Sequence, residues 1–307
     1  MNTRRRFLKN MAGATAGLAL VNLPEKILAR EDLTHLSVLH TNDIHCHIDP
    51  FPPTDPSYPG RGGLARLSAY VQKTREENKN VLLLDAGDMF QGTPYFNYYK
   101  GELILKVMSD IGYEASTIGN HEFDNGLEGI DQHIGFANFP IICSNYDFSQ
   151  TILHDRFPEY KIFQKEDLKI GVYGLGIEMA GLVSDKNYGE TRYLDPVKVA
   201  LKMESFLKNE KKCDLVICLS HLGLGYREDK ISDKLLAPQT RFTNLIIGGH
   251  THTFLDEPLQ LKNADDNLII VNQAGWAGLV LGRIDFIFDK SKKGSPVIYP
   301  QNVGAIL

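Results

Sequence analysis

The chain has 307 residues, of which 43% are hydrophobic and 23% charged, and this composition is ordinary for a soluble globular protein with a sizeable core. Its formal net charge of -5 argues against sequence-independent binding of a nucleic-acid polymer, which requires a basic footprint. No apolar run reaches the roughly 18 residues that span a membrane, so no stable membrane span is expected.

Residues 1–29 have the composition of an export signal. A basic start, which includes Arg4 and Arg5, precedes a mildly apolar stretch rich in Ala and Gly, and Ala29 offers a small residue at a plausible cleavage site. The arginine pair, followed closely by Phe7, resembles a twin-arginine export signal. An ordinary secretory signal and an uncleaved anchor are the alternatives. We therefore expect a periplasmic or otherwise exported protein.

After this leader, strand-like and helix-like stretches alternate along the chain. Short apolar runs between turn residues predict strands, and longer segments with helical periodicity predict helices, one of them capped by Asp195. Because no linker divides the sequence, we expect one α/β domain over residues 30–307, with sheets covered by helices. In chain order we expect a strand at 36–40, a helix at 64–78, a strand at 81–85, a helix at 102–111, strands at 114–118, 141–143 and 170–175, a helix at 196–209, and strands at 214–219, 245–247, 269–272 and 280–288.

Five of these apolar runs are followed by residue types that bind metals. In open α/β sheets ligands bind beyond the carboxyl ends of the strands, so these five ends can converge on one place. Two divalent metals there would activate water and stabilise the charge of a phosphate ester. A mixture of imidazole, carboxylate and amide donors favours borderline transition metals. The motifs are Asp43-Ile44-His45, Asp88, Asn120-His121, His221 and His250-Thr251-His252.

Asn120 and His121 are adjacent, and neighbouring side chains point to opposite sides of an extended backbone. If Asn120 binds a metal, His121 can face the substrate instead. Asp124, three residues on, could hydrogen-bond to this imidazole and favour its protonated form. His121 is therefore a candidate for stabilising the transition state or for protonating the leaving oxygen.

Taken in order, the five motifs resemble the N-terminal calcineurin-like metallophosphoesterase domain of the 5′-nucleotidase family. The resemblance covers nearly all of residues 36–288, and residues 62–66 and 273–278 look like two further marks of that family. It implies a four-layer sandwich, in which two mixed β-sheets pack face to face and helices flank them. Members of the family commonly act on nucleotides in the periplasm or outside the cell.

The same resemblance implies a role for each motif residue. Two divalent metal ions are implied, with zinc, manganese, iron or cobalt as possible identities. One ion would be held by Asp43, His45, Asp88 and His252, and the other by Asp88, Asn120, His221 and His250, with Asp88 bridging. His121 and Asp124 are implied as the catalytic pair.

The sequence thus predicts an exported, dinuclear metal-dependent phosphohydrolase of nucleotide catabolism, which releases phosphate from phosphomonoesters, with 5′-nucleotides favoured. Full-length family members carry a C-terminal domain for nucleotide specificity, and we expect that domain to be absent because the sequence ends at Leu307. Three alternatives stay open. They are the catalytic subunit of a split 5′-nucleotidase that needs a separate C-terminal-domain partner, a 2′,3′-cyclic nucleotide phosphodiesterase, and a non-catalytic metal-binding protein.

Several polar residues outside the motifs have a structural interpretation that is favoured over a functional one. Asp85 ends a strand, and we expect it to position the following loop. His40 and His47 flank the first motif and are expected to support it rather than bind metal. The four cysteines form no CxxC pair and are expected to be free rather than joined in disulfides. A cluster of aromatic residues at 95–99 is expected at the surface or the edge of the core.

Overall fold

The computed structural model describes residues 33–290 and 296–303 of the chain. The predicted export signal at residues 1–29 lies outside the described residues. Within those residues, none of the helices combines the length and the apolar character that crossing a membrane requires.

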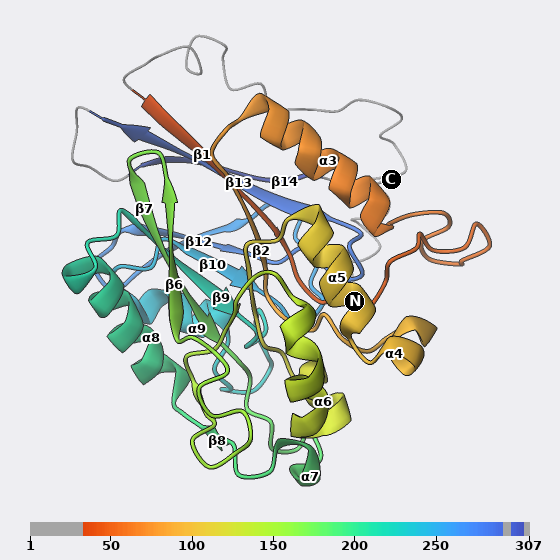
Figure 1. The fold of residues 1–307 in the computed structure, drawn as a ribbon. Coiled ribbons are helices and arrows are strands. Elements are labelled where there is room, and N and C mark those ends of the chain that lie inside the picture. The colour runs from red at the N-terminus through yellow and green to blue at the C-terminus, as the bar shows by residue number, and fades with distance from the viewer. Residues whose placement is uncertain (1–32, 291–295, 304–307) are drawn as a thin grey trace.

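The first of two six-stranded sheets joins the earliest strands of the described chain to the latest (Figure 1). Strands β1 to β4 run parallel, whereas β13 is antiparallel to both of its neighbours. Thr41 pairs with Asp85, so the loops that carry Asp43 and Asp88 leave the same edge of the sheet. The strand order is β14 (Val297–Val303), β13 (Leu281–Asp289), β1 (Leu33–Thr41), β2 (Val81–Asp85), β3 (Ala115–Thr117) and β4 (Ile141–Ile142).

The second sheet has a parallel centre and antiparallel edges. Gly248 pairs with Ser220, so the segments that carry His221 and His250 also leave their sheet together. The strand order is β11 (Leu259–Lys262), β12 (Leu268–Asn272), β10 (Leu245–Gly248), β9 (Leu215–Ser220), β7 (Leu168–Leu175) and β6 (Tyr160–Lys165). A separate two-stranded sheet pairs β5 (Tyr146–Asp147) with β8 (Arg192–Tyr193).

Apolar side chains pack between the two sheets and on both of their outer faces. Alternation along β1 sends Leu36 and Val38 between the sheets, where they meet residues such as Ile217 and Ile247, while Leu39 packs against the outer helices. The order of layers is therefore helix, sheet, sheet, helix. This arrangement confirms the predicted four-layer sandwich of two mixed sheets.

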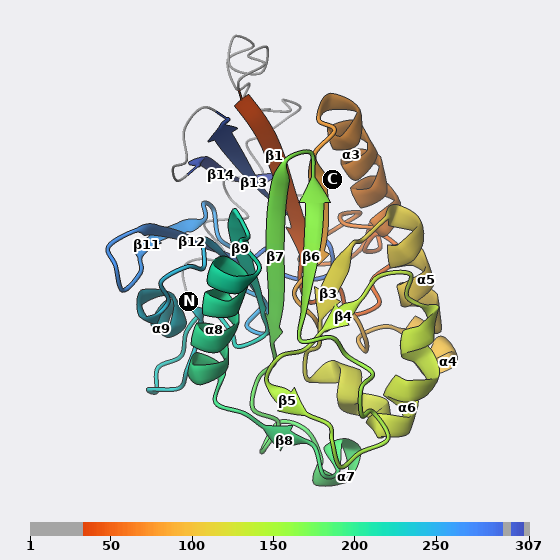
Figure 2. The same ribbon diagram turned by 60° about the vertical axis from the view of Figure 1, so that its left-hand side comes forward.

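Helices cover the outer face of each sheet (Figure 2). The first sheet is covered by α3 (Leu64–Glu77), α5 (Glu102–Ile111) and α6 (Gly126–His133), and the second by α8 (Pro196–Ser205) and α9 (Asp233–Leu236). As predicted, the Asp195 side chain caps α8 by accepting hydrogen bonds from the backbone N–H groups of Val197 and Lys198. The shorter helical segments are α4 (Pro94–Tyr99), η1 (His121–Asn125), η2 (Ile134–Phe136), α7 (Asp185–Tyr188), η3 (Phe206–Glu210) and η4 (Ala237–Gln239).

The element predictions are confirmed for the buried strands and incomplete at the sheet edges. β2 and α5 have the predicted bounds, and the other predicted strands are shifted by a few residues at most. β6 and β11 were missed because they alternate exposed and half-buried residues and contain no continuous apolar run. The predicted helix at 196–209 is divided, since α8 ends at Ser205 and η3 continues it as a π-helical turn.

Candidate dinuclear metal centre

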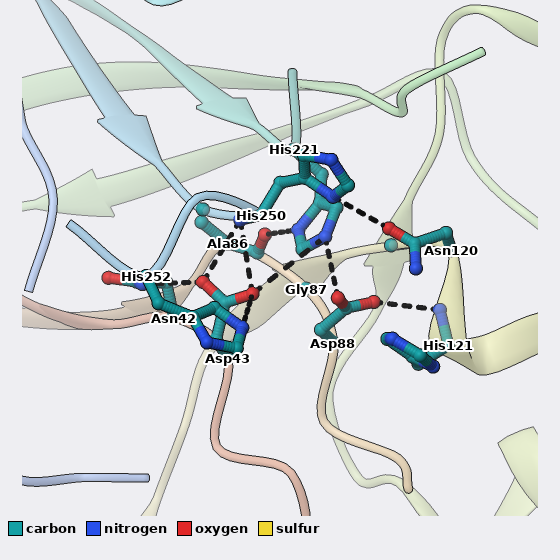
Figure 3. A network of polar contacts seen from close by, with 12 residues as sticks. Asn42, Asp43, Ala86, Gly87, Asp88, Asn120, His121, His221, His250 and His252 are labelled. Carbon is teal, nitrogen blue, oxygen red and sulfur yellow. Dashed lines mark hydrogen bonds and ion pairs between the residues drawn. The ribbon is translucent and has the colours of Figure 1, made fainter. Parts of the chain in front are cut away.

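The seven side chains that the sequence marks as metal ligands lie together beyond the carboxyl ends of the strands (Figure 3). They form two adjacent groups, and within each group of three the ligand atoms lie within 4.8 Å of one another. Asn120 adjoins the second group through His250. The first group is Asp43, His45 and His252, and the second is Asp88, His221 and His250.

In the first group, two imidazole nitrogens face each other beside a buried carboxylate. Nε2 of His252 lies 3.0 Å from Nε2 of His45 and 3.3 Å from Oδ1 of Asp43. Nδ1 of His45 donates a hydrogen bond to the carbonyl oxygen of Phe90 at 3.0 Å, which leaves Nε2 with a lone pair. Two imidazoles and a carboxylate that converge in this way, with His45 oriented by a backbone carbonyl, have the arrangement of ligands around one cation.

In the second group, His221 is wholly buried and is held in the same way. Its Nδ1 donates to the carbonyl oxygen of Ala86 at 2.7 Å. Its Nε2 lies 2.9 Å from Oδ2 of Asp88, but this contact lacks hydrogen-bond geometry, so the atom has no hydrogen-bond partner. Nδ1 of His250 lies 2.8 Å from Oδ1 of Asn120. A buried nitrogen without a hydrogen bond, aimed at a carboxylate, fits a position prepared for a metal ion.

Asp88 lies between the two groups. Its Oδ2 is 2.9 Å from Nε2 of His221 and 4.0 Å from Nε2 of His45. Asp43 approaches the second group as well, with its Oδ1 3.9 Å from Nε2 of His221. One carboxylate oxygen thus faces members of both groups, which is the position of a bridging ligand. The side chains present fit two neighbouring divalent cations.

Most of the candidate ligands have an unusual backbone conformation. Positive φ angles are rare for non-glycine residues, and each costs about 1–3 kcal/mol unless the surroundings enforce it. Strained backbone conformations of this kind are concentrated at functional sites, where they set the direction of the side chains that bind or react. The residues and angles are Asp43 at 52°, His45 at 50°, Asp88 at 56°, His250 at 71° and His252 at 48°.

Glu122 enforces the conformation of the Asp88 loop. The sequence placed this residue within a motif but predicted no role for it. Its buried carboxylate accepts hydrogen bonds from the backbone N–H groups of Asp88, Met89, Phe90 and Gly119. Burial and the charge of Asp88 raise the pKa of Glu122 to about 7, whereas the backbone donors oppose that rise. One carboxylate therefore joins the loop after β2 to the loop after β3.

Two amide side chains hold the loops of the first group, and they too were missed as individual residues. Nδ2 of Asn42 donates to Oδ2 of Asp43 and to the carbonyl oxygen of Gly275, each at 2.6 Å. Oε1 of Gln273 accepts a hydrogen bond from the backbone N–H of Thr253 at 2.6 Å. The segment at 273–278, noted in the sequence only as a family mark, therefore connects the loops of Asp43 and His252.

His121 and Asp124 lie beside the metal groups at the start of η1. Nδ1 of His121 is 2.8 Å from Oδ2 of Asp124, and the two side chains are 35% and 33% exposed. Partial burial disfavours the imidazolium, but the hydrogen bond with Asp124 and the charge of Asp88 outweigh it and raise the pKa of His121 to about 9. Asn120 and His121 point to different partners as predicted, but the extended backbone that the prediction assumed is wrong, because Asn120 has helical φ and ψ angles of -77° and -29° and His121 begins η1.

The residues given structural interpretations occupy structural positions. Oδ1 of Asp85 accepts a hydrogen bond from the N–H of Gly87 and so positions the loop before Asp88. His40 lies buried between the sheets against Asn272, and His47 stacks on an aromatic neighbour outside both groups. The four cysteines are free and buried, as expected. In the aromatic cluster of α4, Phe96 is buried whereas Tyr98 and Tyr99 are exposed.

Comparisons with known proteins agree with this geometry. Residues 36–254 match the family model of the calcineurin-like phosphoesterases. A snake venom 5′-nucleotidase of Gloydius brevicauda is 31% identical over 294 residues, which cover 87% of this chain and 48% of that protein. The crystal structure of a 5′-nucleotidase precursor from Thermus thermophilus has a TM-score of 0.79 and 31% identity, and the match covers 88% of this chain and 54% of that one.

A second solved structure has a similar fold and also matches this chain over most of its own length. It is the calcineurin-like phosphoesterase YfkN from Bacillus subtilis, with a TM-score of 0.73 and 28% identity over 89% of this chain and 91% of that chain. By contrast, the chain spans about half the length of the curated relatives that it matches.

Proposed function

Because this chain belongs to the calcineurin-like phosphoesterase family, we propose that it is a metal-dependent phosphohydrolase that releases phosphate from phosphomonoesters. The observation that supports the proposal best is the pair of donor groups that meet at Asp88. Beside them lies an imidazole that is paired with a carboxylate and remains partly accessible. Storage or transport of a metal does not require that pair, so the site favours catalysis over simple metal binding.

In this proposal two divalent ions occupy the centre. Asp43, His45, Asp88 and His252 would hold one, and Asp88, Asn120, His221 and His250 the other. The ions would supply a nucleophile from water at neutral pH and would neutralise charge on the phosphate. The donor set suits zinc, manganese, iron or cobalt.

The proton for the leaving group comes from His121 in this proposal. Its Nδ1 faces Asp124, so Nε2 is the nitrogen that is free to donate to the leaving oxygen or to a phosphate oxygen. Asp124 fixes the orientation of the ring and stabilises the imidazolium. The backbone N–H of His121 donates to Oδ1 of Asp88 at 2.8 Å, so the acid is held in register with the metal ligands.

We propose 5′-nucleotides as the substrates, because the relatives that match most of this chain include 5′-nucleotidases from a snake venom and from Thermus thermophilus. The alternative is a split enzyme, in which a separate partner supplies nucleotide selectivity. Export, directed by residues 1–29, would place the activity in the periplasm or outside the cell. Replacement of Arg4 and Arg5 by lysine in a reporter fusion tests the twin-arginine part of that expectation.

The test is phosphate release by the purified chain, with manganese, zinc, cobalt and magnesium compared on each substrate. The substrates are 5′-nucleotides, sugar phosphates, an aryl phosphate, a bis-aryl phosphate and 2′,3′-cyclic nucleotides. We expect metal-dependent turnover, with monoesters hydrolysed faster than diesters. Faster diester hydrolysis would favour the phosphodiesterase alternative, and nucleotide turnover only with a co-purified chain would favour a split enzyme. Metal-loaded protein without turnover on any of these compounds contradicts the proposal.

A further inference from the structure

We infer that Trp276 is a positioning residue for His252 and that it sets the affinity of the metal ion bound by Asp43, His45 and His252. The inference rests on the metal site proposed above, but not on the reaction that the site performs. The indole of Trp276 and the imidazole of His252 are stacked with nearly parallel planes, with ring centroids 5.6 Å apart and an angle of 5° between the planes. No other ring contact of His252 among the described residues is parallel.

His252 differs from His45 and His221 in how its ring is held. The second ring nitrogen of His45 donates to the carbonyl of Phe90, and that of His221 donates to the carbonyl of Ala86. Within the described part of the chain, Nδ1 of His252 has no such hydrogen bond, and its side chain is 38% exposed, compared with 5% for His45. Metal-binding histidines usually have an outer partner that fixes the ring. For His252 the stacked indole takes that place.

The loop that carries Trp276 is fastened to both sides of the first metal group. The backbone N–H of Ala277 donates to the carbonyl oxygen of Asp43 at 2.8 Å. The backbone N–H of Gly275 donates to the carbonyl oxygen of Thr253 at 3.0 Å, directly after His252. Trp276 therefore lies on a short segment whose position is tied to two of the three ligands that it would serve.

Other aromatic rings brace Trp276 nearly at right angles. The centroids of the rings of His47, Phe51 and Tyr58 lie 5.1, 5.8 and 6.3 Å from that of Trp276, at interplanar angles of 86°, 73° and 71°. These edge-to-face contacts are favourable arrangements for aromatic side chains. They restrict rotation of the indole, so its stacked face stays on His252.

A bound cation makes the stack stronger, because it withdraws electron density from the imidazole while the indole face is electron-rich. Stacked aromatic pairs contribute enough to change a binding constant by about threefold to tenfold. We therefore expect loss of the stack to weaken one metal-binding step by about that factor. The step at Asp88, Asn120, His221 and His250 has no contact with the indole and should change little.

The first experiment is a calorimetric titration of metal-free protein with Mn²⁺ and with Zn²⁺. Trp276→Leu, which keeps apolar bulk but removes the ring, should weaken one of the two steps threefold to tenfold. Trp276→Phe should recover most of the wild-type affinity. Tyr58→Leu is the graded comparison, because it removes one of the rings that brace Trp276 but keeps the stack on His252. It should weaken the same step by a clearly smaller factor than Trp276→Leu does.

The second experiment uses fluorescence, since Trp276 is the single tryptophan of the chain. Addition of metal to the wild type should change the emission with one of the two binding steps. His252→Ala should abolish that change, whereas His250→Ala should retain it. This readout requires no turnover, and it stands even if Trp276→Leu fails to fold.

Unchanged affinities in Trp276→Leu, or an emission that does not respond to bound metal, would overturn the inference while leaving the metal site intact. An equal weakening of both steps in Trp276→Leu and Tyr58→Leu would also overturn it, because that result describes general loosening of the cluster. A wild-type chain that binds no metal overturns the inference together with the proposed function. The two failures are therefore distinguishable.

Discussion

Oδ1 of Asp88 accepts a hydrogen bond from the backbone N–H of His121 at 2.8 Å. The other carboxylate oxygen, Oδ2, faces the imidazoles of both metal groups. One side chain thus divides its two oxygens between the proposed metals and the loop of the proposed acid. Changes at Asp88, at His121 and at the residues that hold them should consequently have separable effects.

Asp88→Asn should remove the bridging charge while keeping an oxygen for the N–H of His121. We expect no more than one tightly bound metal ion per chain and a fall of at least about a hundredfold in kcat/KM. Metal analysis after dialysis and steady-state kinetics measure the two effects. Unchanged metal content in this variant would contradict the bridging role.

His121→Ala should separate catalysis from metal binding. The imidazole is not a ligand of either group and only packs edge-on against the ring of His45, with ring centroids 5.2 Å apart, so metal content should stay at the wild-type level. Loss of a general acid lowers kcat by about a hundredfold to ten-thousandfold. Phosphate-release kinetics and metal analysis on the same sample provide the measurement, and His154→Ala, at an exposed position, is the control. A fall in activity that merely follows a fall in metal content would argue against the assigned role.

Asp124→Asn should shift the pH profile rather than abolish activity. Partial burial lowers the pKa of His121, and Asp124 and Asp88 more than restore it, to about 9. The protonated imidazole is the active form, so activity falls as the pH rises through this pKa. Removal of the Asp124 charge lowers the pKa, and the alkaline fall in kcat should move to lower pH. An alkaline limb at the wild-type position would contradict the pairing.

Glu122→Gln should destabilise the fold and the metal loop together. The amide group of glutamine replaces an acceptor oxygen, so some of the four backbone donors lose their partner. We expect the free energy of unfolding to fall by about 1–3 kcal/mol, measured by denaturant titration. Glu128→Gln, at an exposed position on α6, should change it by less than about 0.5 kcal/mol. Equal stability of the two variants would contradict the anchoring role of Glu122.

His40 should make the metal-free protein less stable in acid. Burial lowers the pKa of His40 from 6.5 to about 3, so the folded state resists a proton that the unfolded state accepts. Stability from this residue is complete above pH 6.5 and is lost as the pH falls toward 3, with a slope of up to about 1.4 kcal/mol per pH unit. His40→Gln should show a shallower slope than the wild type, and His154→Gln the wild-type slope. Denaturant titrations across this range in the presence of a chelator provide the test.

The motif order and the buried strands could be predicted because their signals are local. β2, β9 and β10 are apolar runs that are buried along their whole length, and each is followed within a few residues by a candidate ligand. Parallel pairing of β9 with β10 places the ends of these two strands at one edge of their sheet, so the proximity of His221 and His250 follows from the sheet type. β2 belongs to the other sheet, and its end meets theirs only when the sheets pack.

The edge strands and the supporting contacts required the tertiary structure. β6 and β11 gain their strand conformation from a neighbour in the sheet, and their own residues carry little apolar signal. The four backbone donors of Glu122 belong to two separate loops, so no window of sequence contains them together.

The order of residues along the chain sets which residue types stand at the ends of the strands, and hence the kind of chemistry that this protein can support. How those ends meet depends on the packing of the layers. His45 and His252 are 207 residues apart in the chain, yet their Nε2 atoms are 3.0 Å apart because two sheets pack face to face. Local propensity acts over a few residues, whereas such contacts depend on the relative position of whole layers.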